Sequence, residues 1–458
     1  MKEMAKKFTT TCLPCVLALL TMIACVPSAS AQTRIVRVVT YNLGSDVGSI
    51  TGPQPGLIAP WNDTNNFAAG GVLQGIGEEL LNGNAQPIDV LALQETKSNA
   101  QTVTPIVDGL NIFYGVPGMY SNSTYQATSS GPTLTGNGPN ALVYNTRTLR
   151  LLASLPVDPP GGTGSLGPSS GMSREVMQYK FAPAGVATNA ANIFYVYVSH
   201  YKSGTGAANE AARLGEATII RNHAATNIPP TARVLYVGDF NTGVAAEGMY
   251  TTLIAPGINQ AIDSVNPTGN TNLTWDGNSV VDVKTFSPTG LHYRDDYQMM
   301  TTNVYYGTTG GLALVAGTYH VFGNNGSVPY LGGLTNGANT ALSNKLVTNG
   351  PVFISALQTY TNLIYASDHL PVVTDYTIPM PAPRITSFSI VGTNLTLSVT
   401  NGITNAVYVV LMSTNVATAF TNWTAVASNA AATGNFTFTA TNVVNKTAAQ
   451  RFYLLKAR

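Results

Sequence analysis

Seven short apolar segments, parted by turn-rich stretches, constrain the fold of this chain most strongly. Each is four to seven residues long and rich in β-branched and aromatic residues, which is typical of buried strands. They span residues 35–41, 90–93, 141–144, 176–181, 194–199, 234–237 and 297–301. Between them, two stretches at 71–81 and 207–224 have helical spacing. Strands interleaved with helices predict a layered α/β sandwich.

The second helical stretch has the pattern of an amphipathic helix that packs on a sheet. Ala, Leu and Ile recur in it at helical spacing, and Glu210, Arg213, Glu216 and Arg221 fall on its other faces. We therefore expect these four charged residues on the side that faces away from the sheet.

Residues 1–31 have the pattern of a secretory signal peptide. Three lysines precede an apolar run at 13–26, which is shorter than the ~20 residues that a membrane span needs. Small residues ending at Ala31 predict cleavage before Gln32 and a secreted or periplasmic protein. The alternative is a lipoprotein processed at Cys25, which the cleaner Ala-Ser-Ala site disfavours.

Composition excludes several classes of site. All three cysteines lie within the predicted signal peptide, so the mature chain has no disulfide, thiolate zinc site or cysteine nucleophile. Without that peptide, 19 basic and 20 acidic residues remain. This net charge does not indicate a nucleic-acid-binding face, although a local stripe of basic residues remains possible. Hydrophobic residues make up 44% and charged residues only 9%, which favours a folded, β-rich extracellular protein.

A proline-rich stretch predicts a domain boundary. Three prolines fall within five positions of the segment 379–384, which predicts a short stiff linker between a first domain at 32–378 and a module at 385–458. The module contains β-rich stretches parted by Asn, Gly and Thr turns and no histidine, so we expect a small all-β sandwich without chemistry of its own. Loops or insertions are expected at 115–140, 157–172 and 303–360.

Six motifs place a polar residue at or beside the end of an apolar segment. The motifs are Thr-Tyr-Asn42, Leu-Gln-Glu95, Val-Ser-His200, Gly-Asp239-Phe-Asn241, Arg-Asp-Asp296-Tyr and Ser-Asp368-His369. Each motif alone is ordinary turn chemistry. Six in this order instead predict one site built from metal-binding and proton-handling residues.

Together these motifs resemble the endonuclease/exonuclease/phosphatase superfamily, which includes pancreatic-type deoxyribonucleases, apurinic endonucleases, neutral sphingomyelinases and inositol polyphosphate 5-phosphatases. The resemblance covers residues 35 to about 376. It implies a DNase I-like four-layered α/β sandwich, in which two central, mainly antiparallel sheets pack face to face with helices outside. The six motif strands then converge on one edge, and 32–378 is the catalytic domain.

The resemblance implies a divalent-cation site. Glu95 is its primary ligand, and Asn42 and Asp368 complete or support it. A phosphodiester is anionic and repels hydroxide, so a hard cation is needed, and oxygen ligands suit Mg²⁺ or Mn²⁺, with Ca²⁺ as a further candidate.

The resemblance also implies the catalytic roles. Asp239 activates or orients the attacking water, and Asn241 holds the water or a phosphate oxygen. His369 contacts the scissile phosphate, and Asp296 hydrogen-bonds its other ring nitrogen. We choose Asp296 over Asp295 because the family places this Asp directly before an aromatic residue.

Two further matches favour the deoxyribonuclease and sphingomyelinase branches. Arg174, in Met-Ser-Arg-Glu, resembles an arginine that faces phosphate in pancreatic-type deoxyribonucleases. His200, in Ser-His-Tyr-Lys-Ser-Gly, resembles their second active-site histidine, and Lys202 beside it is expected to contact phosphate.

Two of the remaining histidines are given structural roles, whereas His292, two residues before Arg294, could border the active-site edge although no family motif includes it. His223 is explained by its place near a helix end and His320 by a loop. Tyr41, Tyr201 and Trp275 either stack on a substrate or, as is usual in β-rich proteins, pack in the core.

The sequence thus predicts a secreted metal-dependent phosphodiesterase, and specifically a nuclease that cleaves DNA or RNA by metal-assisted water attack on phosphorus. The alternatives are a sphingomyelinase-like or other phosphoester hydrolase, and a non-enzymatic surface-binding protein with a relic catalytic domain. Nucleic acid is the expected substrate partner, without stable membrane insertion. We expect a monomer whose C-terminal module binds an unidentified surface or partner.

Overall fold

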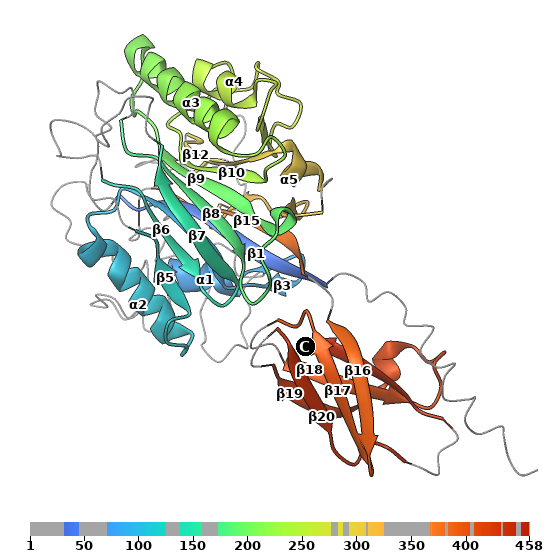
Figure 1. Cartoon of the computed structure of the whole chain (residues 1–458). Coiled ribbons are helices and arrows are strands. Elements are labelled where there is room, and N and C mark those ends of the chain that lie inside the picture. The colour runs from blue at the N-terminus through green and yellow to red at the C-terminus, as the bar shows by residue number, and fades with distance from the viewer. Residues whose placement is uncertain are drawn as a thin grey trace, which may run out of the picture. The chain divides into compact units, whose positions relative to one another are not determined.

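The computed structural model describes most of the chain (Figure 1). The described residues are 32–44, 71–124, 138–157, 173–275, 283–286, 293–307, 310–324, 367, 369–380, 383–403, 407–431, 434–445 and 450–457. The predicted signal peptide, the predicted ligand Asp368 and much of the three predicted loops lie outside them.

Two sheets form the larger of two compact units, which spans residues 33–380. The first sheet has the order β13-β15-β1-β4-β6-β5, with β14 also paired to β15; the second has the order β11-β12-β10-β9-β8-β7. Strands of the first are β1 (Gln32–Asn42), β4 (Ile88–Gln94), β5 (Tyr120–Asn122), β6 (Ala141–Asn145), β13 (Ala313–Leu314), β14 (His320–Val321) and β15 (Val372–Met380). Strands of the second are β7 (Leu149–Pro156), β8 (Met177–Pro183), β9 (Phe194–His200), β10 (Val234–Asp239), β11 (Ala261–Asp263) and β12 (Asp296–Thr301). β1 pairs with β4, and β9 with β10, in parallel, whereas β4 with β6 and β10 with β12 pair antiparallel.

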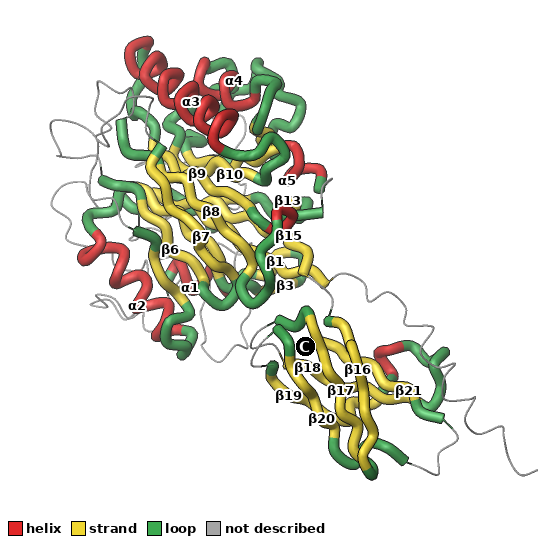
Figure 2. Tube along the Cα trace, viewed as in Figure 1, coloured by secondary structure: helices red, strands yellow, loops and turns green. Residues whose placement is uncertain are grey.

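Helices cover the outer face of each sheet (Figures 1 and 2). Those of the first sheet are α1 (Val72–Glu78) and α2 (Thr104–Phe113), and those of the second are α3 (Ala207–Asn227) and α4 (Gly248–Ile254). The remaining elements of this unit are α5 (Thr302–Tyr306), the hairpin β2 (Leu80–Leu81) and β3 (Asn84–Ala85), and the short helices η3 (Asn99–Val103) and η4 (Ala190–Asn192).

Alternation along the strands produces the layers. In β1, Val36 and Val38 belong to the core between the sheets, whereas Val39 and Tyr41 belong to the core beneath α1 and α2. In β10, Leu235 likewise faces the other sheet, and its neighbours pack under α3 and α4. A strand with apolar residues on both faces needs cover on both faces. The predicted four-layered α/β sandwich is therefore confirmed.

A buried ion pair fixes β1 to β15 and to the hairpin region. The Arg37 guanidinium donates to both Asp375 carboxylate oxygens, at 2.7 and 2.9 Å, and to the carbonyl oxygens of Ile76, Glu79 and Asn84. Arg37 is fully buried and Asp375 nearly so. Removal of either partner would strand a buried charge.

The structure differs from the sequence-based expectation in its helices. α2 and α4 were not predicted, because each is short and its apolar residues show no long helical repeat. The stretch expected to be irregular beyond residue 303 contains α5, β13 and β14 among its described residues. Arg213 and Glu216 were expected to face away from the sheet, but both are buried, with 3% and 1% exposure.

The smaller unit is an all-β module, as predicted. Two three-stranded antiparallel sheets, β16-β17-β20 and β19-β18-β21, enclose an apolar core that includes Leu397, Val410 and Phe438. The strands are β16 (Arg384–Val391), β17 (Asn394–Thr400), β18 (Val407–Ser413), β19 (Thr424–Ala430), β20 (Phe436–Ala440) and β21 (Phe452–Ala457), with the short helix η5 (Phe420–Asn422). β15 ends at Met380, and β16 begins at Arg384.

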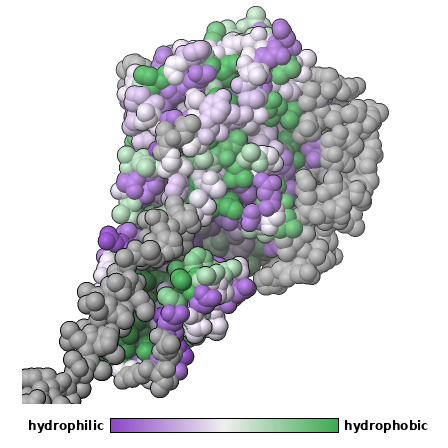
Figure 3. Space-filling model, turned by 90° about the vertical axis from the view of Figure 1, so that its right-hand side faces the viewer, coloured by the Kyte–Doolittle hydropathy of each residue, from purple (hydrophilic) through white to green (hydrophobic). Residues whose placement is uncertain are grey.

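No helix among the described residues is long and apolar enough to cross a membrane. On the face of the protein shown in Figure 3, hydrophilic and hydrophobic residues are interspersed over the larger unit.

Candidate active site

Strand register brings the predicted site residues to one end of the two sheets. In the first sheet, parallel pairing sets Asn42 opposite Gln94, so Asn42 lies beside Glu95. In the second, Asp239 is opposite both His200 in β9 and Asp296 in β12. Because these pairs stand at the ends of the paired strands, their side chains lie close together at the same edge of the two sheets.

Two carboxylates and an amide form the centre of the site. The Asn42 Nδ2 atom donates to Asp239 Oδ2 at 2.9 Å and to Glu95 Oε1 at 3.2 Å. The His200 Nε2 atom lies 3.4 Å from the same Asp239 oxygen and 3.7 Å from the same Glu95 oxygen. A single amide nitrogen thus separates two acids, and the two acidic oxygens converge on one small volume.

His369 is held on three sides. Its Nδ1 atom lies 2.7 Å from Asp296 Oδ2, and its Nε2 atom lies 4.0 Å from Asp239 Oδ2. Its ring stacks on Phe286, with centroids 4.5 Å apart and an interplanar angle of 28°. The backbone N–H of Asp296 donates to Thr285 Oγ1 at 3.1 Å, which fixes this acid in turn. Since a carboxylate only accepts, Nδ1 carries a proton and Nε2 is directed to the centre of the site.

Two site residues have left-handed backbone conformations. Glu95 has φ +53° and Asn241 has φ +52°. Asn commonly adopts this region in turns, and here the N–H of Asn241 donates to Asp239 Oδ1 at 2.9 Å. Glu rarely does, so the conformation of Glu95 is maintained by its surroundings, as is common at functional sites.

Burial perturbs the protonation of the central groups. Burial and the neighbouring Asp296 raise the pKa of Asp239 to about 6. Burial, together with the positive charges of Arg174 and Lys202 and with His369, lowers the pKa of His200 well below its usual value. His200 is therefore neutral at pH 7 and can offer a lone pair.

The residues present fit a divalent cation. Two sets of three ligand atoms lie within 4.8 Å of one another, Glu95-His200-Asp239 and Asp239-Asp296-His369. Among the described residues, the buried Asp296 Oδ1 and His200 Nδ1 atoms have no hydrogen-bond partner. Carboxylate oxygens crowded in a buried place are the donors that hard cations prefer. Glu95 and Asp239 are the residues that would hold the ion, with Asn42 between them.

The two predicted phosphate contacts lie beside this cluster. Arg174 Nη1 donates to the carbonyl oxygen of Tyr201 at 2.8 Å, and Asn241 Nδ2 donates to the same oxygen at 3.1 Å. Lys202 is half-buried and its ammonium group donates to the carbonyl of Ser203 at 2.8 Å. Both cations lie close enough to act on the pKa of His200. Positive charge thus adjoins the acidic centre, as an anionic substrate requires.

His223 and His320 have partners outside this site, and His292 lies outside the described residues. His223 Nδ1 and the hydroxyl of Tyr197 are 2.8 Å apart, and His320 Nε2 lies 2.7 Å from Glu79 Oε2. Tyr41, Tyr201 and Trp275 are all buried in core clusters, so packing accounts for them.

Three residues that sequence reasoning missed support the site. Phe286 and Thr285 contact His369 and Asp296 as described above. Ser367 Oγ donates to the carbonyl oxygen of Asn42 at 2.6 Å and accepts from the N–H of His369 at 3.0 Å. Ser367 lies within the Ser-Asp-His motif, which could have pointed to it, whereas no local pattern marks residues 285 and 286.

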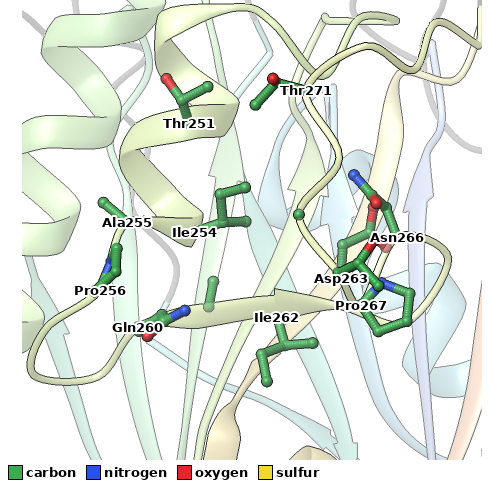
Figure 4. A pocket seen from close by; sticks show the side chains of 13 residues that line it. Thr251, Ile254, Ala255, Pro256, Gln260, Ile262, Asp263, Asn266, Pro267 and Thr271 are labelled. Atoms are coloured by element: carbon green, nitrogen blue, oxygen red, sulfur yellow. The ribbon is translucent and has the colours of Figure 1, made fainter.

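A separate pocket lies between α4 and β11, away from these residues (Figure 4). Its volume is about 450 Å³, and Thr251, Ile254, Gln260 and Asn266 are among the residues that line it. None of the predicted site residues lines it.

No protein-family model matches the sequence, and no curated protein sequence matches it. Solved structures with a similar chain trace do exist. The catalytic domain of human Nocturnin with a bound sulfate anion has 16% identity and a TM-score of 0.42, covering 76% of this chain and 97% of that chain. An endonuclease/exonuclease/phosphatase family protein from Bacteroides thetaiotaomicron has 13% identity and a TM-score of 0.37, covering 76% and 97%. An endonuclease/exonuclease/phosphatase from Beutenbergia cavernae also has 13% identity and a TM-score of 0.37, covering 92% and 96%. The reaction must be inferred from the site residues themselves.

Proposed function

We propose that this chain is a metal-dependent phosphoester hydrolase of the endonuclease/exonuclease/phosphatase type, and specifically an exported nuclease that cleaves phosphodiesters in DNA or RNA. One observation carries the proposal: Asn42, Glu95, Asp239 and the Asp296-His369 pair converge on one small, buried, acidic centre.

The geometry supports a distinct role for each group. Asp239 is placed to orient or deprotonate an attacking water, because its Oδ2 faces both histidines while its Oδ1 is held by the N–H of Asn241. His369, with its Nδ1 proton bonded to Asp296, presents Nε2 to the reacting phosphate. Neutral His200 accepts or relays a hydrogen bond there.

A bound Mg²⁺ or Mn²⁺ would neutralise the phosphoryl oxygens and the leaving oxygen. Glu95 and Asp239 would hold it, and Arg174 and Lys202 would add positive charge on the substrate side. These residues carry out in-line displacement by positioning and charge, so no covalent intermediate is needed.

The nuclease assignment draws on the two sequence matches at Arg174 and His200, and export draws on the predicted signal peptide. We also propose a monomer whose C-terminal module binds a surface or partner outside the cell. Bulk charge near neutrality requires that phosphate contacts be local, which Arg174 and Lys202 satisfy.

The test is hydrolysis of plasmid DNA, RNA and sphingomyelin by residues 32–458, with and without EDTA. Nicking or degradation of nucleic acid that EDTA and His369→Ala abolish, and that His223→Ala leaves intact, supports the proposal. Turnover of lipid alone would reject the nuclease assignment while keeping the hydrolase. Folded protein that acts on none of the three substrates would reject the proposed function.

A further inference from the structure

Helix α3 buries two charged residues on the side where the phosphate contacts lie. Arg213 and Glu216 are 3% and 1% exposed and stand three positions apart, so they share one face of the helix. Buried charges of this kind are expensive in desolvation and are seldom the most stable choice for a packed helix face. Their contacts therefore indicate a role other than stabilising the helix packing.

Glu216 joins two separate segments of the site. Its Oε1 accepts from the backbone N–H of Ser173 at 2.6 Å, and its Oε2 accepts from the backbone N–H of Lys202 at 2.9 Å. Ser173 directly precedes Arg174. Each carboxylate oxygen thus holds one of the two segments that carry the proposed phosphate contacts.

Arg213 holds the peptide group on the other side of Lys202. Its Nη1 donates to the carbonyl oxygens of Lys202 and Gly204, both at 2.8 Å. Its Nε and Nη2 atoms pair with the Glu247 carboxylate at 2.5 and 3.0 Å. Glu247 in turn accepts from the hydroxyl of Thr242 at 2.7 Å. The backbone of Lys202 is therefore fixed at its N–H by the Glu216 carboxylate and at its C=O by the Arg213 guanidinium.

The same network reaches the acidic centre. Arg174 and Asn241 both donate to the carbonyl oxygen of Tyr201, the residue between His200 and Lys202. Asn241 also donates its N–H to Asp239. A shift of the Lys202 segment would therefore move the partner of Arg174 and disturb the residue that fixes Asp239.

We infer that Arg213 and Glu216 are positioning residues that set the phosphate-binding groups Arg174 and Lys202 against the acidic centre. This inference rests on the proposed function for its catalytic consequence, although the clamp itself is independent of it. The carboxylate is essential because two N–H groups approach two different oxygens. A glutamine of the same shape would present an NH₂ group to one of them and repel it.

The activity-independent test is hydrogen–deuterium exchange in Glu216→Gln, followed in peptides that contain Ser173 and Lys202. Loss of a hydrogen bond to a charged acceptor predicts exchange about 10- to 100-fold faster in at least one of the two segments. Glu210→Gln, an exposed acid on the same helix, is the matched control and leaves both unchanged. Unchanged exchange in a folded Glu216→Gln would overturn the clamp. Should that variant fail to fold, Arg213→Lys, which keeps the charge and loses the forked geometry, gives the same measurement at Lys202.

The catalytic test is a mutant cycle against the double variant Arg174→Ala/Lys202→Ala on a phosphodiester substrate. Glu216→Gln lowers kcat/KM by about 10- to 100-fold in the native background and by less than about threefold in the double-variant background, because it acts through these two side chains. Equal losses in both backgrounds would indicate a merely structural role and overturn the inference. A native protein without activity would reject the proposed function, and the exchange experiment would still decide the clamp.

Discussion

The exchange of Asn42 for aspartate tests the acidic centre most quantitatively. The amide nitrogen lies 2.9 Å from Asp239 Oδ2 and 3.2 Å from Glu95 Oε1, so Asn42→Asp replaces a shared donor with a third carboxylate oxygen at the same place. At an effective dielectric constant of 20, two charges about 3 Å apart repel by roughly 5 kcal/mol.

Proton uptake by one of the three acids limits the loss of stability that this repulsion causes. One of the acids can stay protonated at pH 7, and raising its pKa from about 4 to at least 7 costs about 4 kcal/mol. We therefore expect metal-free Asn42→Asp to lose about 4 kcal/mol of unfolding free energy at pH 7. The folded-state pKa is raised above the unfolded value, so the loss grows as pH rises and shrinks by about 1.4 kcal/mol per unit towards pH 4.

The assay is urea unfolding in EDTA at several pH values, followed by tryptophan fluorescence in a Trp423→Phe background so that the larger unit is observed. Added Mg²⁺ should then stabilise Asn42→Asp by more than it stabilises the native protein, since three acids surround the ion instead of two. Asn42→Ala, which removes the donor without adding charge, is the control. A loss below about 1 kcal/mol at pH 7, or a variant that Mg²⁺ stabilises less than the native protein, would refute the geometry of the acidic centre.

Three further changes have defined outcomes. Asp296→Asn should lower kcat by about 10- to 100-fold, because the neutral side chain holds the His369 Nδ1 proton more weakly; steady-state kinetics within twofold of native would contradict this. Arg37→Met should cost about 3–5 kcal/mol in urea unfolding by stranding Asp375, and Arg37→Met/Asp375→Leu should regain the part that is due to the stranded charge, although the carbonyl groups of Ile76, Glu79 and Asn84 still lack their donor; a double variant as unstable as the single one would contradict the buried-pair account. Burial raises the pKa of Asp89 to about 6, above its unfolded value, so the contribution of Asp89 to stability is most favourable at low pH and is lost as pH rises through 6. Relative to Asp89→Asn, the native protein should thus lose up to about 3 kcal/mol between pH 4 and 7, and a difference that stays constant with pH would reject the shift.

Apolar strands alternating with helical stretches predicted an α/β sandwich from local pattern, whereas its four layers came from the resemblance to the superfamily. The strands of the two sheets carry apolar residues on both faces, as β1 and β10 illustrate, and this signal is local. The short helices α2 and α4 were not predicted, because their burial depends on the sheet that they cover and no local sequence pattern specifies that contact.

Site residues could be predicted where they stand at the end of an apolar strand. Residues that only support them from other segments could not be predicted. The register of β1 and β4 brings Asn42 beside Glu95, and the register of β9, β10 and β12 brings His200 and Asp296 beside Asp239. His369 lies outside the named strands and forms an isolated bridge with Phe286. Phe286 stacks on His369 from a segment with no motif.

The two buried charges of α3 show the limit of helical patterns. Arg213 and Glu216 look like solvent-facing residues in sequence, because a charged residue on an amphipathic helix usually faces water. Apart from the Glu247 carboxylate, their partners are backbone groups of Ser173, Lys202 and Gly204, which leave no trace in residue type. Such contacts become visible only when the segments are placed in space.

The central claim is that the acidic centre binds a divalent cation and uses it to hydrolyse phosphodiesters. The most direct measurement is calorimetric titration of Mg²⁺ or Mn²⁺ into metal-free protein, with the hydrolysis rate of a DNA substrate recorded over the same concentrations, for the native chain and for Glu95→Gln. The account predicts that binding and rate rise together over one concentration range and that Glu95→Gln weakens both. Cation binding without a change in rate, or hydrolysis that proceeds equally in EDTA, would contradict it.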